Sequence, residues 1–371
     1  MKTLECDLHD MWHYIERELP DDLEQTAYET GALLRHKGVQ SAVDLLRVIL
    51  TYGTTDLSLK ATATWASSVG LGEMSSVALF NRVKDATPWL SSIISSMLDR
   101  DVNTDMNIGL KISMVDATVL TGPGATETEW RLHTGIDPST GHINSVKLTD
   151  QHTGESYMNY PVEEGEVVVG DRAYALATGI AYVHACGGYV VARANLHSIR
   201  LCDTNKHPIH PVLDEPSVPK VGVAHYDVLI PAPPTKRTKS HKTWKLEHAS
   251  DWIPARLMAV RTKTGSVTWV ITTVPASAAS DIDIMELYRM RWQIELEFKR
   301  LKSLLWLDKL PSRKGPTAES WILSRILAST LVEKLLRNSG VFSPWGYRLR
   351  LYSPDRTPRD RKPTNRATEL T

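Results

Sequence analysis

Apolar residues in the first hundred positions recur every three or four residues, which is the spacing of amphipathic helices. The clearest examples are VQSAVDLLRVIL (39–50), LSLKATATWASSVG (57–70) and MSSVALFNRVKDATPWL (74–90). The last two flank a Gly-Leu-Gly turn at 70–72, so the pattern is compatible with a helix-turn-helix whose second helix enters a DNA major groove. A plain helical bundle produces the same pattern, and both interpretations stay open for 1–104.

Beyond residue 110 the pattern changes to short runs rich in Val, Ile and Thr, which are typical of strands. The segment ATGIAYVHA (177–185) between the last two runs has the pattern of a crossover helix. The four expected strands are LKISMVDATVL (110–120), GHINSVKLTD (141–150), EVVVGD (166–171) and GGYVVARA (187–194). Strands combined with a crossover helix predict a mixed α/β sheet.

The following stretch, 195–265, is irregular and proline-rich, with strand candidates at VAHYDVLI (223–230) and RLMAVRT (256–262). We interpret this stretch as a β-rich insertion. The apolar run VTWVITTVP (267–275) predicts a further buried strand. Two helices are expected after it, at 281–305 and 317–338.

Composition places the chain among globular proteins. It has 371 residues, of which 42% are hydrophobic and 23% charged, so we expect two or three domains with sizeable cores. Cys6, Cys186 and Cys202 form no disulfide pattern, which favours a reducing compartment such as the cytoplasm. We expect neither a membrane span nor a signal peptide, because no apolar run is long enough and the N-terminus is acidic.

Charge is distributed unevenly, although the formal net charge is zero. Residues 281–371 hold 18 Lys and Arg against 11 Asp and Glu, a net charge of +7, which leaves −7 for 1–280. Such asymmetry is compatible with one region facing nucleic acid. The last 29 residues, 343–371, are rich in Arg and Pro, so we expect a disordered basic tail.

The most informative segment is ELYRMRWQIELEFKRLKSLL (286–305). On a helix, its apolar residues form one buried stripe, made of Leu287, Met290, Ile294, Phe298, Leu301 and Leu305. Tyr288, Arg291, Glu295 and Lys302 fall within an arc of about 60° beside that stripe. A carboxylate there is able to ligate a metal ion while the other three groups reach phosphate oxygens. An ordinary amphipathic helix with an Arg291–Glu295 ion pair is the alternative.

The spacing Tyr-x2-Arg-x3-Glu-x6-Lys, filled by Tyr288, Arg291, Glu295 and Lys302, resembles the signature of the "insertion sequence four" family of bacterial transposases. The preceding strand and the residues around the signature are similar as well, over roughly 105–310. The resemblance implies a ribonuclease-H-like catalytic domain with a β-rich insertion, preceded by an all-helical N-terminal region. It also implies two further acids at strand ends, which complete a three-carboxylate (DDE) site.

Asp116 in SMVDATVL and Asp171 in VVVGDRAYA match those acids, because each follows an apolar strand candidate. With Glu295 they would be both the catalytic residues and the ligands of two Mg²⁺ ions, for which Mn²⁺ substitutes. Ions about 3.5–4 Å apart activate the attacking oxygen and stabilise the leaving one. Two structural alternatives stay open: Asp116 as the cap of a turn, and Asp171 as the N-cap of a helix over 172–185.

The resemblance implies a metal-dependent transposase that hydrolyses phosphodiesters and transfers strands at element ends, by cut-and-paste through a hairpin. Its partners are then double-stranded terminal repeats, target DNA and a second copy of the chain, since synapsis of two ends needs a dimer. A catalytically impaired remnant that only binds DNA and a stand-alone metal-dependent nuclease are the alternatives. The expected divisions are 1–104 (helical, end-DNA binding), 105–194 (first catalytic part), 195–265 (insertion), 266–340 (second catalytic part) and 341–371 (tail).

Two weaker features lie in the expected insertion. Cys202, His207 and His210 are spaced like zinc ligands, but no fourth ligand is placed to complete a tetrahedral site, so we do not expect zinc. The segment TKRTKSHKTWK (235–245) combines basic residues with an aromatic one. Lys242 and Trp244 are therefore candidates for phosphate contact and base stacking, with a solvated loop as the alternative.

Overall fold

The computed structural model describes residues 7–98, 110–121, 130–138, 143–210, 217–234, 246–262, 265–291, 310 and 315–338. Helices at the two ends of this range enclose a region of strands. The helices are α1 (Asp7–Glu16), α2 (Leu23–Glu29), α3 (Ala42–Thr54), α4 (Leu59–Ser68), α5 (Ser76–Asp85), α6 (Thr87–Met97), α7 (Ala177–Ala185), α8 (Asp281–Arg289) and α10 (Pro316–Asn338). The strands are β1 (Ile112–Leu120), β2 (Trp130–Ile136), β3 (Ile143–Asp150), β4 (Val167–Gly170), β5 (Tyr189–Arg193), β6 (Leu201–Cys202), β7 (Pro208–Ile209), β8 (Ala224–Ala232), β9 (Asp251–Arg261) and β10 (Val267–Thr272).

The regular elements within residues 7–98 are helices, α1 to α6, joined by turns and loops, as predicted. Serines begin its central helices: Ser41, Ser58 and Ser75 each accept a hydrogen bond from the backbone N–H three residues ahead, which satisfies a helix-end donor. The single helix expected over 74–90 is wrong, because α5 ends at Asp85 and α6 begins at Thr87. Proline in the first turn of α6 explains the break, since it cannot continue a helix from the preceding turn.

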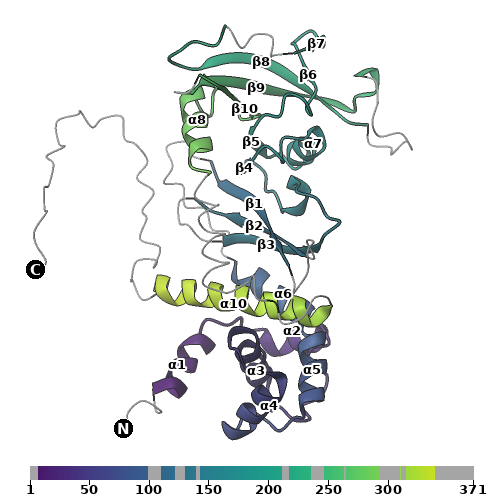
Figure 1. Ribbon diagram of the computed structural model, residues 1–371, viewed down its shortest axis with the longest axis vertical. Helices are drawn as coiled ribbons and strands as arrows, with labels where there is room; N and C mark the ends of the chain where they lie inside the picture. The colour runs from purple at the N-terminus through teal and green to yellow at the C-terminus, as the bar shows by residue number, and fades with distance from the viewer. Residues whose placement is uncertain are drawn as a thin grey trace, which may run out of the picture.

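Helix α10 lies between the N-terminal helices and the strands (Figure 1) and packs on α3, α5 and α6. It approaches α3 so closely that a Cβ on Gly53 would come within 2.4 Å of the Ser324 Cβ. Its N-terminal end is joined to α6 by a 2.8 Å hydrogen bond between the hydroxyls of Thr87 and Ser320. None of the helices in the described ranges is long and apolar enough to cross a membrane.

The described strands form one mixed sheet in the order β3-β2-β1-β4-β5-β10-β9-β8-β6-β7. Strand β2 is antiparallel to both of its neighbours, β1 and β3, whereas β1, β4 and β5 are parallel. Helix α7 makes the crossover between β4 and β5, as parallel neighbours require. Strands β6 to β9, from the expected insertion, extend the same sheet at the far edge of β10.

Each face of the central sheet belongs to a different apolar core. Val167 and Val169 of β4 point into a core shared with α8, α10 and the N-terminal helices, whereas Val168 points into a second core under α7. Residues that alternate along a strand point to opposite faces. Because β4 is buried on both faces, its sequence is a continuous apolar run, which is why it was predictable.

Strand β2 was missed by the sequence prediction because WRLHTGI carries polar residues that the fold buries. His133 and Thr134 are fully buried in it. Burial, followed by the charges of Arg131 and Lys147, lowers the pKa of His133 to about 4. His133 therefore occupies the interior uncharged, where its ring is 2.9 Å from the Thr149 hydroxyl on β3.

Candidate active site

The candidate site forms where two parallel strands part. Strand β4 ends at Gly170, whereas β1 runs on to Leu120 as the antiparallel partner of β2. Asp116 therefore lies in the middle of β1, and the prediction that the strand ends at this residue is wrong. From just before Asp116, β1 has no strand beside it on the side where β4 lay. The Asp116 carboxylate can therefore be exposed although the residue lies within a strand.

Strand register places Asp116, Asp171 and Arg193 side by side in one row. The two aspartates of this row are called the acidic row below. The β1–β4 pairing ends at Met114–Val169, and two residues further it places Asp116 beside Asp171. The β4–β5 pairing, continued one residue beyond its last pair, places Arg193 on the other side of Asp171. Neighbouring strands lie about 4.8 Å apart, so the two predicted aspartates are side by side although 54 residues separate them in sequence.

The same register fixes the face to which this row belongs. Asp171 shares its side of β4 with Val167 and Val169, because residues two apart along a strand point the same way. These valines lie in the core that includes Ile284 and Leu287 of α8. The row of charges therefore lies on the face of the sheet that α8 covers.

The Asp116 carboxylate lies in a partly buried environment near other carboxylates. The pKa of Asp116 is raised to about 6, chiefly by burial and also by the charges of Asp171 and Glu155. A hydrogen bond from the Ala117 N–H and the charge of Arg291 act in the opposite direction. Repulsion between close carboxylates favours protonation of one of them unless a cation joins them.

Asp171 begins a turn rather than a helix. Its carboxylate accepts a 2.7 Å hydrogen bond from the Ala173 N–H, and its carbonyl accepts one from the Tyr174 N–H. Helix α7 starts later, with Leu176 as its N-cap, so the alternative that Asp171 caps a helix over 172–185 is wrong. The turn uses one carboxylate oxygen of Asp171 and orients the side chain.

Helix α8 supplies Tyr288, and the turn after it supplies Arg291. The Arg291 guanidinium lies 5.9 Å from the centre of the Tyr288 ring. Burial raises the pKa of Tyr288, Arg291 and Arg193 lower it, and Asp171 raises it. The charges that act on each side chain place Tyr288 near Asp171 and Arg291 near Asp116.

The predicted helix over 281–305 begins where expected but ends early. A capping box formed by Ser280 and Asp283 starts α8 at Asp281, and the helix ends at Arg289. The Arg291 N–H bonds to the carbonyl three residues back, which tightens the final turn. Residues 292–309 lie outside the described residues.

Several residues at the site were not singled out from the sequence. Glu155 is half-buried, and its pKa is raised by burial and then by Asp171, against the opposing effect of Arg131. Arg172 donates a 2.8 Å hydrogen bond to Asn195. Of these residues, Arg193 had a usable signal, because it lies near the end of the strand predicted over 187–194, which the fold pairs parallel to β4. Glu155 lies in a turn with no pattern of its own.

Four predicted site residues lie outside the described residues: Glu295, Lys302, Lys242 and Trp244. Among the residues that are described, no three His, Cys, Asp or Glu side chains are grouped so that they could hold a metal ion. Of the zinc-like trio, Cys202 is buried in β6, and the His207 ring lies 3.4 Å from the Asp203 carboxylate.

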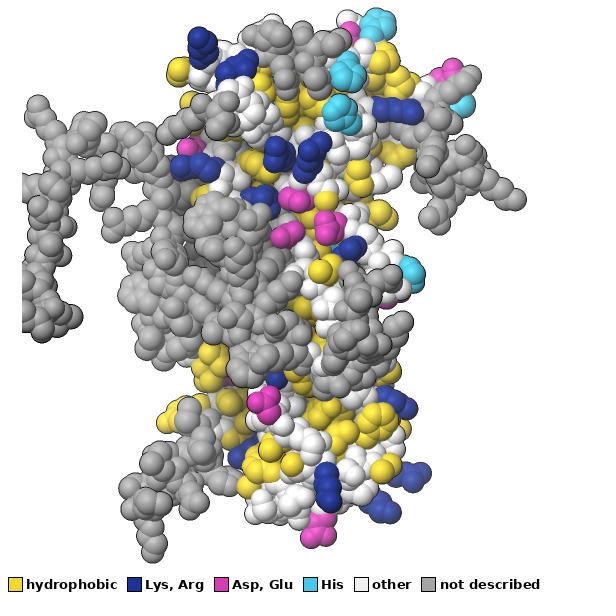
Figure 2. Space-filling view, viewed as in Figure 1, with side chains coloured by type: hydrophobic (Ala, Val, Ile, Leu, Met, Phe, Trp, Pro, Cys, Tyr) yellow, Lys and Arg dark blue, Asp and Glu magenta, His cyan; other side chains and the backbone are white. Residues whose placement is uncertain are grey.

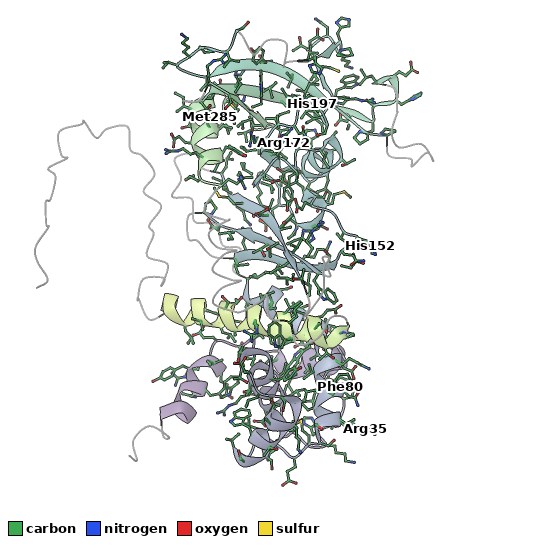
Figure 3. The ribbon with its side chains drawn as sticks, viewed as in Figure 1. Arg35, Phe80, His152, Arg172, His197 and Met285 are labelled. Atoms are coloured by element: carbon green, nitrogen blue, oxygen red, sulfur yellow. The ribbon has the colours of Figure 1, made fainter. Side chains whose placement is uncertain are left out.

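The surface around the sheet shows the same association of charges. Figure 2 shows acidic side chains gathered over the middle of the strand region, with basic side chains directly beside them. Arg172 lies over the sheet and Met285 lies beside it on α8 (Figure 3).

The family model of the transposase DDE domain matches residues 108–331, which include every described residue of the acidic row. The chain therefore belongs to the transposase DDE domain family. Membership implies an activity that cleaves and transfers DNA, and enzymes of this family generally use divalent metal ions.

Two relatives match almost end to end. The transposase for insertion sequence element IS421 of Escherichia coli is 29% identical over 361 residues, which cover 91% of this chain and 96% of the relative. InsL of insertion sequence element IS186A, from Escherichia coli strain K12, is 29% identical over 360 residues with the same coverage. A chain in a cryo-EM structure of the piggyBac transposase synaptic complex with hairpin DNA is 11% identical, with a TM-score of 0.42, over 89% of this chain and 74% of its own. That likeness is too low to support an argument.

Proposed function

We propose that the chain is an insertion-sequence transposase that cleaves DNA at the ends of its element with Asp116, Asp171 and Glu295. The observation that carries this proposal is the row formed by the first two acids on the face of the sheet covered by α8. The order β3-β2-β1-β4-β5, antiparallel first and parallel afterwards, supports a ribonuclease-H-like catalytic core. The strands beyond β10 then correspond to the β-rich insertion.

The donor set fits Mg²⁺, with Mn²⁺ as a substitute. Asp116 and Asp171 offer only oxygen ligands, which Mg²⁺ prefers, and few are needed because the ion keeps several waters. Burial, and after it the charges of Asp171 and Glu155, raise the pKa of Asp116, and a bound dication would offset these effects by stabilising the carboxylate. When bound, two such ions supply Lewis-acid activation of the attacking and leaving oxygens. Glu295 is proposed as the ligand that completes the site.

The remaining signature residues are proposed to hold the DNA strand. Arg291 can bind a phosphate through two N–H groups, Lys302 acts as a point charge and Tyr288 donates one hydrogen bond. Positioning contacts of this kind lower the barrier by keeping the reacting groups in line. Tyr288 and Arg291 lie at the row, which supports assigning the chain to the "insertion sequence four" type.

Cut-and-paste transposition through a hairpin, on two synapsed ends held by a homodimer, is the course we propose for the reaction. Lys242 and Trp244 are proposed to contact DNA from the insertion, and residues 1–104 to recognise the element ends. The proposed location is the bacterial cytoplasm, at the nucleoid. These proposals rest on the resemblance of the signature segment and on membership of the family.

Replacement of each carboxylate by the matching amide tests the assignment. Asp116→Asn, Asp171→Asn and Glu295→Gln remove the charge that the ions require while keeping the shape. We expect each variant to lose cleavage of a plasmid carrying the DNA that flanks the gene, in Mg²⁺ or Mn²⁺. Binding to a labelled fragment of the same DNA in Ca²⁺ should persist.

Asp150→Asn is a matched control, because Asp150 is an aspartate of the same sheet, the last residue of β3, and lies outside the acidic row. It should cleave like the wild type. Persistent cleavage in one of the three amide variants would remove that residue from the site. Wild-type protein that binds but never cleaves would instead be an impaired remnant, and cleavage without strand joining would indicate a nuclease.

A further inference from the structure

Where β1 leaves β4, backbone groups of β1 lose their hydrogen-bonding partners on the neighbouring strand. Pairing between the two strands ends at Met114, yet β1 continues through Asp116, so its edge loses its hydrogen-bonding neighbour there. A buried carbonyl in that position needs another donor. The donor is Tyr160, whose hydroxyl lies 2.7 Å from the Asp116 carbonyl oxygen.

A second tyrosine continues this contact to the other aspartate. The hydroxyls of Tyr160 and Tyr174 are 2.9 Å apart. Since Tyr160 gives its single proton to Asp116, Tyr174 is the donor in the second bond. Tyr174 is the third residue after Asp171, and its N–H bonds to the Asp171 carbonyl. Two hydroxyls thus link the main chain at one aspartate to the turn that carries the other.

The pair is shielded from water. Tyr160 is 3% exposed and Tyr174 is 1% exposed. Their ring centres are 6.1 Å apart, and Tyr157 packs against Tyr174 at 5.2 Å. Burial raises the pKa of both hydroxyls well above the usual value, so both keep their protons. In such surroundings a hydrogen bond is strong and a missing partner is costly.

We propose that Tyr160 and Tyr174 are positioning residues that set the spacing of Asp116 and Asp171, and thereby the affinity of the acid pair for divalent cations. Neither tyrosine needs to touch metal or DNA. Their hydroxyls hold the two segments together where no strand pairing does so. This inference rests on the proposed function, because it assumes that the two carboxylates share metal ions.

The test compares Tyr160→Phe and Tyr174→Phe in the full-length protein. Each change removes one hydroxyl and keeps the ring. Direct Mn²⁺ binding, measured by electron paramagnetic resonance of the free ion, should weaken about 10-fold, as it does when groups that orient metal ligands are removed. The Mn²⁺ concentration for half-maximal plasmid cleavage should rise by a similar factor, and DNA binding in Ca²⁺ should be unchanged.

Tyr182→Phe is the matched control, because the Tyr182 hydroxyl also donates to a backbone carbonyl, that of Tyr160, at 3.0 Å. It should leave Mn²⁺ affinity unchanged. The double variant Tyr160→Phe/Tyr174→Phe should lose little more affinity than either single variant, since the hydroxyls act as one unit.

A drop in melting temperature without a change in Mn²⁺ affinity would overturn the positioning role and leave the proposed function intact. An equal loss of affinity in Tyr182→Phe would also overturn it. Failure of the proposed function looks different: Asp171→Asn would bind Mn²⁺ as the wild type does. In that case, unchanged Mn²⁺ affinity in the tyrosine variants would reject both the positioning role and the proposed function.

Discussion

At the scale of single residues, the acidic row depends on the space available at Gly170. This glycine immediately precedes Asp171 and lies against two tyrosines of the second core. A Cβ at this position would come within 2.7 Å of the Tyr157 hydroxyl oxygen and 2.8 Å of the Tyr174 Cβ. The Tyr174 Cβ is fixed to the main chain, so it cannot move away without displacing the turn that orients Asp171.

Gly170→Ala should therefore destabilise the protein and impair cleavage together. Overpacking of this kind costs about 1–3 kcal/mol, and the strain falls on the turn holding Asp171. The free energy of unfolding in urea and the rate of plasmid cleavage are the measurements. Gly154→Ala is the control, because a Cβ there meets nothing within 4 Å. Wild-type stability and activity in Gly170→Ala would show that the turn tolerates displacement.

The sequence predicted these aspartates but not the surroundings that orient them. Asp116 and Asp171 could be identified because each follows an apolar run and because the signature in 286–305 directs attention to them. Glu155, Tyr160 and Tyr174 could not, since a tyrosine or glutamate in a loop has no periodicity. Their roles arise only where β4 stops and β1 continues.

At the scale of elements, a buried arginine of β9 holds the N-terminal end of α8 on the sheet. Arg256 on β9 bonds to the Asp281 carboxylate at 2.7 Å and to the carbonyls of Val274 and Ala279. The His225 ring on β8 lies 2.7 Å from the other oxygen of Asp281 and 3.1 Å from Asp227. Strands of the expected insertion thus anchor the helix that carries Tyr288.

This anchor should depend on pH through His225. Burial lowers the pKa of His225, but hydrogen bonds to Asp281 and Asp227 and their charges outweigh that effect and raise it. A raised pKa in the folded state means that the stabilisation is fully present below the unfolded pKa of about 6.5. It is lost as pH rises through the folded pKa. The guanidinium of Arg256 lies at the other oxygen of Asp281 and repels the charge of the protonated histidine.

The melting temperature of His225→Gln should consequently fall below that of the wild type by more at pH 5.5 than at pH 8.5. Exposed His197, labelled in Figure 3, provides the control variant His197→Gln, which should melt like the wild type at both values. A difference between wild type and His225→Gln that is constant with pH would show that the histidine contributes packing alone.

Elements were predictable where burial and pattern agreed. Strands β1, β4 and β10 are apolar runs, and α3 and α7 have clear helical spacing, so all five were found. Strand β2 was missed because its sequence is partly polar. Its polar residues become buried only when β2 pairs with β1 and β3. The end of α8 at Arg289 could not be predicted either, because the apolar spacing in the sequence continues beyond that residue.

At the scale of the whole molecule, one apolar core runs from the N-terminal helices through α10 to the face of the sheet that carries the acidic row. Trp321, Ile322 and Leu327 of α10 are buried in it. Helix α10 follows α8 in the sequence yet packs on α3 and α6, so the C-terminal part of the chain joins the helical region to the strands. Strand order and this long-range packing lay beyond the sequence, which carries no signal for which segments become neighbours.

The central claim is that three acids, distant in sequence, meet at one metal site. Iron-mediated cleavage of the main chain tests it most directly, because Fe²⁺ bound in place of Mg²⁺ produces hydroxyl radicals that cut the backbone nearby. With ascorbate and peroxide, the wild-type chain should be cut near Asp116, Asp171 and Glu295, and excess Mg²⁺ or Asp171→Asn should suppress all three cuts. Cuts near the two aspartates but not near Glu295, or cuts elsewhere that persist in excess Mg²⁺, would contradict the account.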